Sequence, residues 1–226
     1  VTPPLRSIDQ PLTDQPPPPA RDWPNPNAPL LTRDGTIKSA VVFLRGIDPR
    51  KSRPWDYPPV KVDLIGQQFQ IRQGEVLTTR YGFVRTGDDC EFVSGDAVYH
   101  SLLGRGSNLF GITLPTAHKA RLRKLSKPGI VELSSGAGYF WMRAYLFVDH
   151  HPYYTRTSGT GQFCLDQVPE GEYDLVAWHP GWTIQQEERN PESNRVQKIQ
   201  FAPAIVTAQR VQVERGKTAK VRVSLP

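Results

Sequence analysis

The chain has 226 residues, of which 38% are hydrophobic, so one large domain or two small ones can bury a core without disulfides or metals. The longest apolar runs, at 40–44 and 144–148, are far shorter than the ~20 residues that a membrane-spanning helix needs. The 28 Lys and Arg against 22 Asp and Glu give a net charge of +6, which suits an acidic partner, but the basic residues match no nucleic-acid-binding motif. We therefore expect neither a transmembrane segment nor a nucleic-acid partner.

The first part of the chain is rich in proline. Ten of the 22 prolines lie before residue 31, and four of them are consecutive at 16–19. Proline fixes φ and lacks an N–H, so this composition favours extended polyproline II. Residues 1–35 are therefore predicted to form an extended arm that docks on a partner through Pro17, Pro18, Trp23, Leu30 and Leu31. Deleting residues 1–30 would then leave the rest folded. The alternative is an arm that packs only on its own domain.

Beyond the arm, the chain shows short β segments separated by turns. Apolar and polar residues alternate over 172–178 and 210–213, and turn sequences with Gly or Pro occur at 126–129, 158–161 and 169–171. No stretch shows a sustained helical period flanked by caps. The fold class is therefore predicted to be all-β, with two β-sandwiches in series. The predicted strands cover residues 37–44, 60–65, 68–72, 75–84, 90–93, 119–125, 130–133, 143–148, 162–165, 173–178, 205–213 and 219–225.

The densest basic cluster lies between residues 118 and 127. Its charged side chains alternate with Ala120 and Leu122, which is typical of a strand with a solvated face. We interpret the cluster as such a face rather than as a binding site. Its members are His118, Lys119, Arg121, Arg123, Lys124 and Lys127.

Two segments resemble parts of a cupredoxin. Residues 87–100 place Cys90 and Phe92 at inward strand positions, and a turn then precedes His100. In cupredoxins this histidine is the first copper ligand, and a later loop supplies a cysteine, a second histidine and usually a methionine. The matching loop here is 133–142, which ends in Met142 and follows a similar strand at 127–133. The resemblance implies a cupredoxin-like Greek-key sandwich over residues 36–141.

The copper ligands of that family are largely missing. A blue-copper site needs a thiolate and two imidazoles, with a weak axial thioether. His100 and Met142 match the family's ligand positions, but the loop has Ser134, Ser135 and Tyr139 where the thiolate and the second imidazole belong. We therefore expect no bound metal and no other cofactor, with His100 and Met142 as vestigial ligands. Metal-free cupredoxin-like domains such as ephrins use this sandwich for protein contacts.

The other polar motifs do not predict catalysis. Asp149, His150 and His151 are the best metal candidates by composition, but adjacent strand side chains point to opposite faces, so ordinary polar contacts are expected. His100 is expected to be buried and hydrogen-bonded. No phosphate-binding loop, nucleophile elbow or zinc-protease motif is present. A non-enzymatic protein is predicted, although a site assembled from distant residues stays open.

Residues 142–226 resemble a carboxypeptidase regulatory-like, or transthyretin-like, domain. The specific pattern is T-x-x-x-G-x-F-x-L-x-x-V-P-x-G-x-Y-x-L over 157–175, and 218–225 is similar to the closing strand. In this pattern Phe163, Leu165, Tyr173 and Leu175 form one core face. Truncating Phe163 to alanine would cost about 3 to 5 kcal/mol if that face is fully buried. The polar segment 183–204 departs from the pattern and is predicted as an extra surface loop.

Two assignments remain open at this stage. Residues 36–46 also fit as the opening strand of the second sandwich, with the cupredoxin-like part inserted behind it. A single disulfide is arithmetically possible, but Cys90 is expected to face inward and Cys164 outward, which disfavours it. The two cysteines form no zinc or redox motif. Numbering from Val1 fits removal of a signal peptide and predicts export.

A ligand-depleted cupredoxin-like domain behind a Pro-rich arm points to a non-enzymatic, exported accessory or scaffolding subunit. Its expected place is the periplasm or cell envelope, extrinsic to a membrane complex, with other protein subunits as partners. One alternative is a copper-binding electron-transfer protein, which the missing thiolate argues against. Another is a carbohydrate or cell-surface adhesion module, but we interpret the aromatic side chains as core and interface residues. These are Trp141, Tyr145, Tyr153, Tyr154, Trp178 and Trp182.

Overall fold

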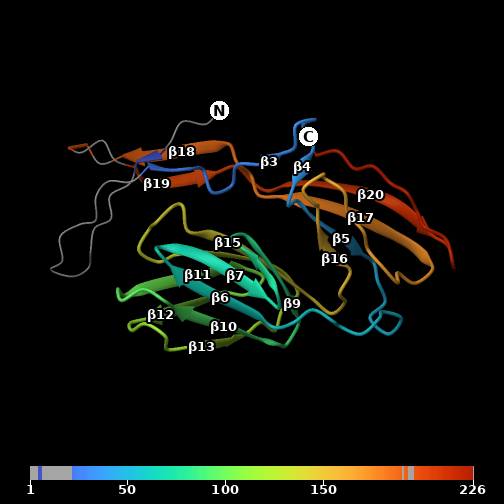
Figure 1. Cartoon of the computed structure of the whole chain (residues 1–226), viewed down its shortest axis with the longest axis horizontal. Coiled ribbons are helices and arrows are strands. Elements are labelled where there is room, and N and C mark those ends of the chain that lie inside the picture. The colour runs from blue at the N-terminus through green and yellow to red at the C-terminus, as the bar shows by residue number, and fades with distance from the viewer. Residues whose placement is uncertain (1–4, 7–21, 190, 193–195, 226) are drawn as a thin grey trace. The chain divides into compact units, whose positions relative to one another are not determined.

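The computed structural model describes residues 5–6, 22–189, 191–192 and 196–225, and these residues form strands and loops only (Figure 1). The predicted all-β class is confirmed. Because the described ranges contain no helix, no helix among them could cross a membrane.

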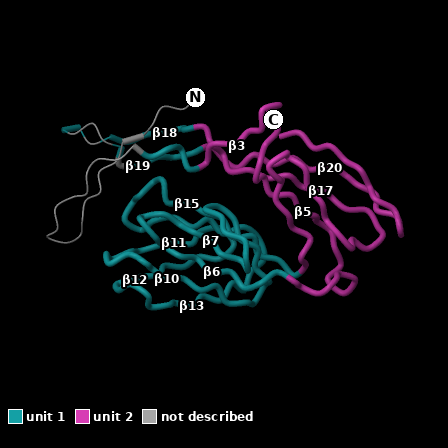
Figure 2. The backbone as a smooth tube through the Cα atoms, in the orientation of Figure 1, with its two compact units in different colours: residues 1–26, 57–150, 184–201 teal, residues 27–56, 151–183, 202–226 magenta. Residues whose placement is uncertain are grey.

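The chain divides into two compact units, which are described separately (Figure 2). The first unit takes residues 1–26, 57–150 and 184–201, and the second takes 27–56, 151–183 and 202–226. Each unit is thus assembled from three separate stretches of sequence. The two units are interleaved along the chain rather than arranged in the predicted simple series.

The first unit is a β-sandwich of two five-stranded sheets. One sheet has the order β13-β10-β6-β7-β8, and the other has the order β12-β11-β14-β15-β9. The pairs β10/β6 and β15/β9 are parallel, and the remaining pairs are antiparallel. The strands of the first sheet are β6 (Val60–Ile65), β7 (Gln68–Gln73), β8 (Val76–Thr78), β10 (Asp89–Ser94) and β13 (Arg121–Lys124). Those of the second are β9 (Tyr81–Arg85), β11 (His100–Gly106), β12 (Phe110–Leu114), β14 (Gly129–Ser135) and β15 (Arg143–Asp149).

The core of the first unit lies between these two sheets. Leu64 and Phe92 from one sheet, and Leu133 and Leu146 from the other, belong to one cluster of fully buried side chains. Burial alternates along β14 as its sequence pattern requires, because successive side chains of a strand point to opposite faces. The inward positions predicted for Cys90 and Phe92 are confirmed.

Glycines interrupt the apolar pattern of β11 and β12, which sequence inspection did not identify as strands. Gly104 lies opposite Phe110 in the register of this pair. A Cβ at Gly104 would lie 2.4 Å from the Phe110 ring, so the aromatic side chain occupies the space above the glycine. The pairing of these strands therefore depends on a cross-strand contact rather than on alternation within either strand.

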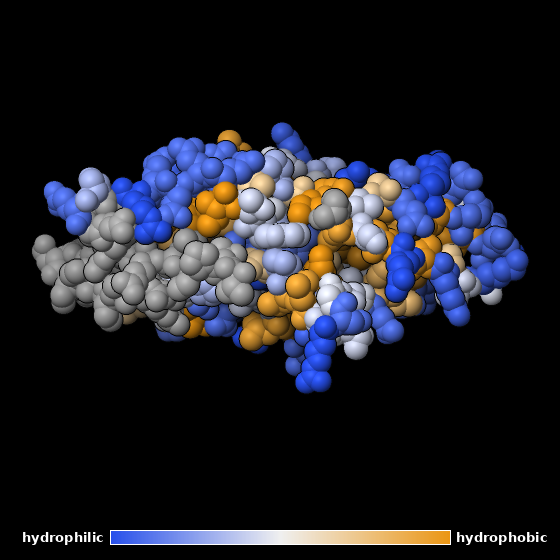
Figure 3. All heavy atoms as spheres, turned by 90° about the horizontal axis from the view of Figure 1, so that it is seen from above, coloured by the Kyte–Doolittle hydropathy of each residue, from blue (hydrophilic) through white to orange (hydrophobic). Residues whose placement is uncertain are grey.

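The second unit is organised around a four-stranded sheet in the order β16-β5-β17-β20. Its strands are β5 (Val41–Arg45), β16 (Tyr154–Arg156), β17 (Gly171–His179) and β20 (Ile205–Val213). Leu44, Tyr153, Leu175 and Val211 form part of its buried core. On the face of the chain shown in Figure 3, hydrophobic residues gather in patches between larger hydrophilic areas.

Two segments predicted as strands pack on this core without being strands. Residues 162–165 and 219–225 have no sheet partners, yet burial alternates along both. Phe163 and Leu165 from the first, and Val221 and Val223 from the second, are half-buried against the core. Alternation in the sequence thus predicted correctly which side chains of these segments face the core. The prediction that the segments are paired strands of a sheet was wrong.

The predicted domain boundaries are corrected by the strand pairing. β5 pairs with β16 and β17, so residues 36–46 belong to the second unit, the alternative that the sequence left open. β15 pairs with β14 and β9, so residues 143–149 belong to the first sandwich and not to the predicted domain 142–226. Both strands are continuous apolar runs, which fit the centre of either sheet.

The predicted arm and the predicted surface loop also differ from expectation. Leu5–Arg6 (β1) pairs with Asp22–Trp23 (β2), and Leu30–Leu31 (β3) pairs with Ile37–Lys38 (β4), so residues 22–35 are not a simple extended arm. Residues 184–201 form a hairpin of β18 (Ile184–Arg189) and β19 (Val196–Phe201). Val196 and Ile199 are buried in the core of the first unit, which explains why this polar segment is not a loop.

The partial burial of Phe163 lowers its expected contribution to stability. We expect Phe163→Ala to cost about 1 to 3 kcal/mol, because the side chain keeps part of its surface in water. Leu175→Ala, in the fully formed sheet, should cost about 2 to 5 kcal/mol. Urea denaturation checks both, with the exposed Gln162→Ala as control. A larger loss for Phe163→Ala than for Leu175→Ala would contradict this packing.

Candidate functional site

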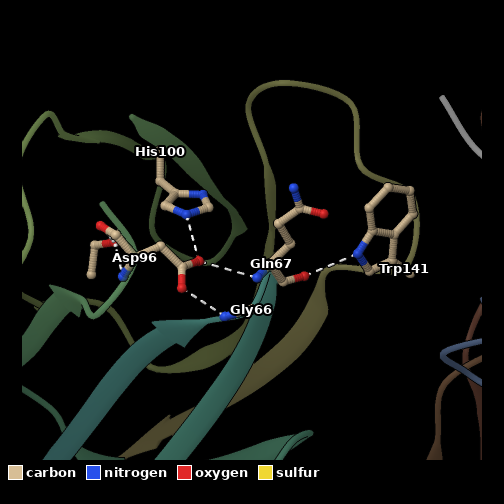
Figure 4. Close-up of polar contacts among 6 residues, drawn as sticks. Gly66, Gln67, Asp96, His100 and Trp141 are labelled. Atoms are coloured by element: carbon tan, nitrogen blue, oxygen red, sulfur yellow. Dashed lines mark hydrogen bonds and ion pairs between the residues drawn. The ribbon is translucent and has the colours of Figure 1, made fainter. Parts of the chain in front are cut away.

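His100 occupies a buried position at one end of the first sandwich (Figure 4). It begins β11, is 3% exposed, and its Nε2 lies 2.9 Å from Oδ2 of Asp96. A carboxylate only accepts hydrogen bonds, so Nε2 is the protonated nitrogen in this contact. The predicted buried, hydrogen-bonded histidine is confirmed.

Asp96 lies in the turn before β11 and connects it to the turn between β6 and β7. Its Oδ1 accepts a hydrogen bond from the Gly66 N–H (2.7 Å), and its Oδ2 accepts one from the Gln67 N–H (3.1 Å). The Oγ of Ser94 accepts a further bond from the Asp96 N–H (3.1 Å). One carboxylate therefore holds an imidazole and two backbone amides from the β6–β7 turn. Sequence inspection did not single out Asp96; its signal is the Ser-Gly-Asp turn four residues before His100.

Trp141 closes the loop that would carry the remaining copper ligands. Its indole Nε1 donates to the Gln67 carbonyl oxygen at 2.9 Å. Its ring stacks with that of Trp23, with centroids 4.7 Å apart and planes at 6°, and with that of Tyr139, at 4.9 Å and 17°. Phe140 contacts it edge-on with centroids 5.1 Å apart. Four aromatic side chains thus fill the end of the sandwich, and Gln67 joins them to Asp96.

The β18–β19 hairpin covers the neighbouring part of this end. The guanidinium of Arg143 lies 4.9 Å from the centroid of Phe201, and its Nη2 donates to the Ile199 carbonyl at 3.4 Å. Arg143 also forms an ion pair with Glu132 on β14. A segment far along the sequence is thereby fastened to β14 and β15.

The predicted site residues are divided between core and surface. Met142 is 1% exposed and belongs to the hydrophobic core. Trp23 is 3% exposed and packs on Trp141 of its own unit, so its predicted role as a partner anchor is corrected: a large indole gains more by this burial than by remaining in water. Leu30 and Leu31 are 50% and 53% exposed, as a docking role requires. Pro17 and Pro18 lie outside the described residues.

The residues present do not fit a blue-copper centre. His100 offers one imidazole, Met142 supplies a thioether, and Ser135 uses its Oγ to accept the Ala137 N–H at 3.1 Å. Two neutral ligands cannot replace the thiolate and paired imidazoles of such a site. Among the described ranges, no three His, Cys, Asp or Glu side chains gather in a way that would hold a metal.

Neither cysteine supplies the missing thiolate. Burial, assisted by Asp88 and Asp89, raises the pKa of the Cys90 thiol to about 12, so it stays protonated in the core. Cys164 is exposed, and its hydrogen bond to Asp166 raises the pKa of that thiol as well. Both cysteines are free, in agreement with the prediction that disfavoured a disulfide.

The aromatic residues considered for sugar binding are almost all in the interior. Their predicted role in packing is confirmed for the buried members of the set, and Trp182 is half-buried. His151 is also buried, and its Nδ1 accepts the Tyr153 N–H at 3.4 Å, which is the ordinary polar contact expected for it. The buried members are Trp141, Tyr145, Tyr153, Tyr154 and Trp178.

Removing the Asp96 carboxylate should destabilise the first unit. Asp96→Ala leaves the buried His100 imidazole and two backbone amides without their acceptor, so we expect a loss of about 2 to 4 kcal/mol. Asp96→Asn keeps one acceptor oxygen and should lose less. Chemical denaturation measures both, with the exposed Asp88→Ala as control. Equal stability of Asp96→Ala and Asp88→Ala would contradict the bridging role.

Burial of Trp23 reverses the expectation for truncation of the chain. Because Trp23 packs on Trp141, deleting residues 1–30 should destabilise the first unit rather than leave it unchanged. Trp23→Ala should cost about 3 to 5 kcal/mol, and Trp23→Phe less, since the latter keeps part of the stack. Thermal unfolding tests this, with the exposed Pro24→Ala as control. An unchanged transition for Trp23→Ala would contradict the packing.

Comparison with protein families gives one partial match. Residues 126–221, less than half of the chain, match the family described as polysaccharide lyase family 4, domain II, a range that contains the 157–175 pattern. No curated protein matches the chain.

Similar solved structures include copper proteins. A purple cupredoxin from Nitrosopumilus maritimus is 11% identical, with 39% of this chain and 97% of that chain covered and a TM-score of 0.30. A methionine-to-alanine mutant of amicyanin, in its Cu(I) form, is 12% identical, with 47% of this chain and 97% of that chain covered and a TM-score of 0.31. A copper-containing nitrite reductase from Thermus scotoductus SA-01 is 16% identical over 46% of this chain and 25% of its own, with a TM-score of 0.33.

Proposed function

We propose that this chain is a non-enzymatic accessory or scaffolding subunit that acts by binding other proteins. The observation that carries the proposal is the closed end of the first sandwich, where Asp96 and Trp141 hold His100 and the 133–142 loop in place. The polar groups at this end are used in contacts with one another, and the aromatic stack fills the remaining space. Such an arrangement supplies rigidity rather than reactive ligands.

The proposed location is the periplasm or cell envelope, where the chain would be extrinsic to a membrane complex. Among the described residues of the predicted arm, the docking role falls to those beyond Trp23. There, Leu30 and Leu31 form one strand of a two-stranded hairpin and expose about half of their side-chain surface. Two adjacent exposed leucines on an ordered strand offer a partner an apolar contact at a low entropy cost.

We assign a regulatory-like binding role to the second unit. Its support is the V-P-x-G-x-Y turn, in which the Tyr173 hydroxyl donates to the Pro169 and Glu170 carbonyls at 3.1 and 3.2 Å. Gly171 has a φ of 152°, a conformation that side chains rarely adopt. The tyrosine and the glycine of the pattern therefore stabilise this turn of the second unit.

Carbohydrate binding is the second candidate function. The match of residues 126–221 to a domain of a polysaccharide lyase family favours it. The aromatic side chains that would stack on sugars are mostly buried, which leaves this candidate behind protein binding.

Isolation of the endogenous protein tests the proposed function. We expect it to be recovered with a protein partner at fixed stoichiometry and without one copper per chain by elemental analysis. Leu30→Glu combined with Leu31→Glu should release the partner, because two carboxylates cannot be buried unpaired in an apolar contact.

The matched control introduces the same charges at Val76 and Leu77, which are 49% and 54% exposed on β8. This control should retain the partner. Stoichiometric copper, an intense visible thiolate-to-copper band, or a chain that purifies alone and binds glycans instead would contradict the proposal.

A further inference from the structure

The basic cluster at 118–127 includes a strand at the margin of a sheet. β13 hydrogen-bonds to β10 on one side and ends the order β13-β10-β6-β7-β8 on the other (Figure 1). All four of its side chains are exposed, and Leu122 shows 65% of its surface to solvent. β13 is therefore an edge strand that the described residues of its unit leave open.

The backbone of β13 has hydrogen-bonding groups on its open side. The Leu125 N–H donates to the Asp88 carbonyl at 3.0 Å, directed toward the β10 side of the sheet. Backbone groups alternate in direction along a strand, so the N–H and C=O of Leu122 and Lys124 point away from the sheet. These groups are a template for one more strand.

The register places two cations side by side at this edge. Arg121 lies opposite Phe92 and Arg123 opposite Cys90, whose side chains are in the core, so both arginines project from the core-side face at its margin. The Arg123 guanidinium lies 5.6 Å from the Phe110 ring centroid, and its Nη2 donates to the Gly111 carbonyl at 3.4 Å.

Within the described part of the chain, no carboxylate lies in ion-pair distance of either arginine. The interactions of Arg123 are with a ring and a neutral carbonyl, and the acidic Glu91 of β10 pairs instead with Lys61. Two positive charges thus stand at the margin of the sheet, and none of the described carboxylates pairs with them.

Charge decides which strand this edge accepts. A second copy of β13 would bring arginines opposite arginines, and like charges on directly opposed residues destabilise a strand pair. A strand with carboxylates opposite Arg121 and Arg123 would form two cross-strand ion pairs. The residue between those carboxylates would lie opposite Leu122 on the other face, where an apolar side chain fits.

We propose that the open edge of β13 binds an extended acidic segment of a partner protein, with the pattern acidic–apolar–acidic, as an added strand. This inference rests on the proposed function, because it names the chemistry of a protein partner. The net charge of +6 would assist the encounter with such a segment. Backbone hydrogen bonds would supply affinity, and the two arginines would select the sequence.

A capped peptide of about eight residues with alternating Glu and Val probes this edge in the full chain, with binding followed by fluorescence anisotropy. We expect saturable binding that weakens at least tenfold, by roughly 1.4 kcal/mol or more, in the Arg121→Glu, Arg123→Glu double variant. The same variant should bind the corresponding Lys and Val peptide, because the charges are then exchanged.

Two controls separate strand addition from general attraction. The Lys220→Glu, Arg222→Glu double variant makes the same change in net charge at exposed residues with the same spacing, and it should bind the acidic peptide like the unaltered chain. A peptide N-methylated on alternate backbone nitrogens keeps its carboxylates but loses its donors, and it should not bind.

Three results would overturn the inference. They are no binding of the acidic peptide, equal binding by the two double variants, and equal binding of the N-methylated peptide. In the first case the arginines only protect the edge from self-association. If the endogenous partner is still recovered at fixed stoichiometry in any of these cases, the proposed function stands and only this edge is excluded.

Discussion

The first sandwich depends on one half-buried carboxylate. Asp96 accepts hydrogen bonds from the His100 imidazole and from the amides of Gly66 and Gln67, and it thereby joins the entrance of β11 to the β6–β7 turn. The Gln67 carbonyl then accepts the Trp141 indole, so a single residue links the polar contacts to the aromatic stack. Each group is satisfied only while the others stay in place, which makes this end of the sandwich cooperative.

This arrangement does not suit a copper site. A copper site requires ligands whose lone pairs point into a shared space, whereas here the histidine donates to a carboxylate and the methionine is part of the core. Trp23 stacks on Trp141 of the 133–142 loop, and the β18–β19 hairpin contacts Arg143 just after this loop. Trp23 and the hairpin both come from outside the central sequence of the unit. The result is a rigid sandwich, which we propose binds partners through its exposed surfaces and edge strands.

The specificity that we propose for a partner strand lies at the sheet edges of the first sandwich. β8 and β13 are the two edge strands of one sheet. β8 is only three residues long. β13 presents arginines on its core-side face and an exposed leucine on the other face. An inward-pointing charge at an edge disfavours pairing between copies and, with a complementary partner, selects one strand over another. The same two arginines thus act against self-pairing and in favour of an acidic ligand.

Sequence alone determined the local properties of this protein. Turn residues and alternation indicated an all-β chain, with Cys90 and Phe92 facing inward, and the serines at 134 and 135 showed that the copper ligands are incomplete. His100 was expected to be buried, and it is. These features depend on residue type and on the period of two along a strand, both of which can be seen within a few residues.

Only the tertiary structure decided which strands are partners. The apolar runs at 41–45 and 143–149 fit a sheet of either unit. The first run is assigned by its pairing with β17, which is distant in sequence. The second is assigned by its pairing with β14, which was predicted to lie in the other domain. The polar hairpin at 184–201 and the indole of Trp23 become core elements because they cover Trp141 and its neighbours. Alternation specifies which face of a strand is buried, but the surface that buries it comes from remote parts of the chain, and no local pattern encodes that choice.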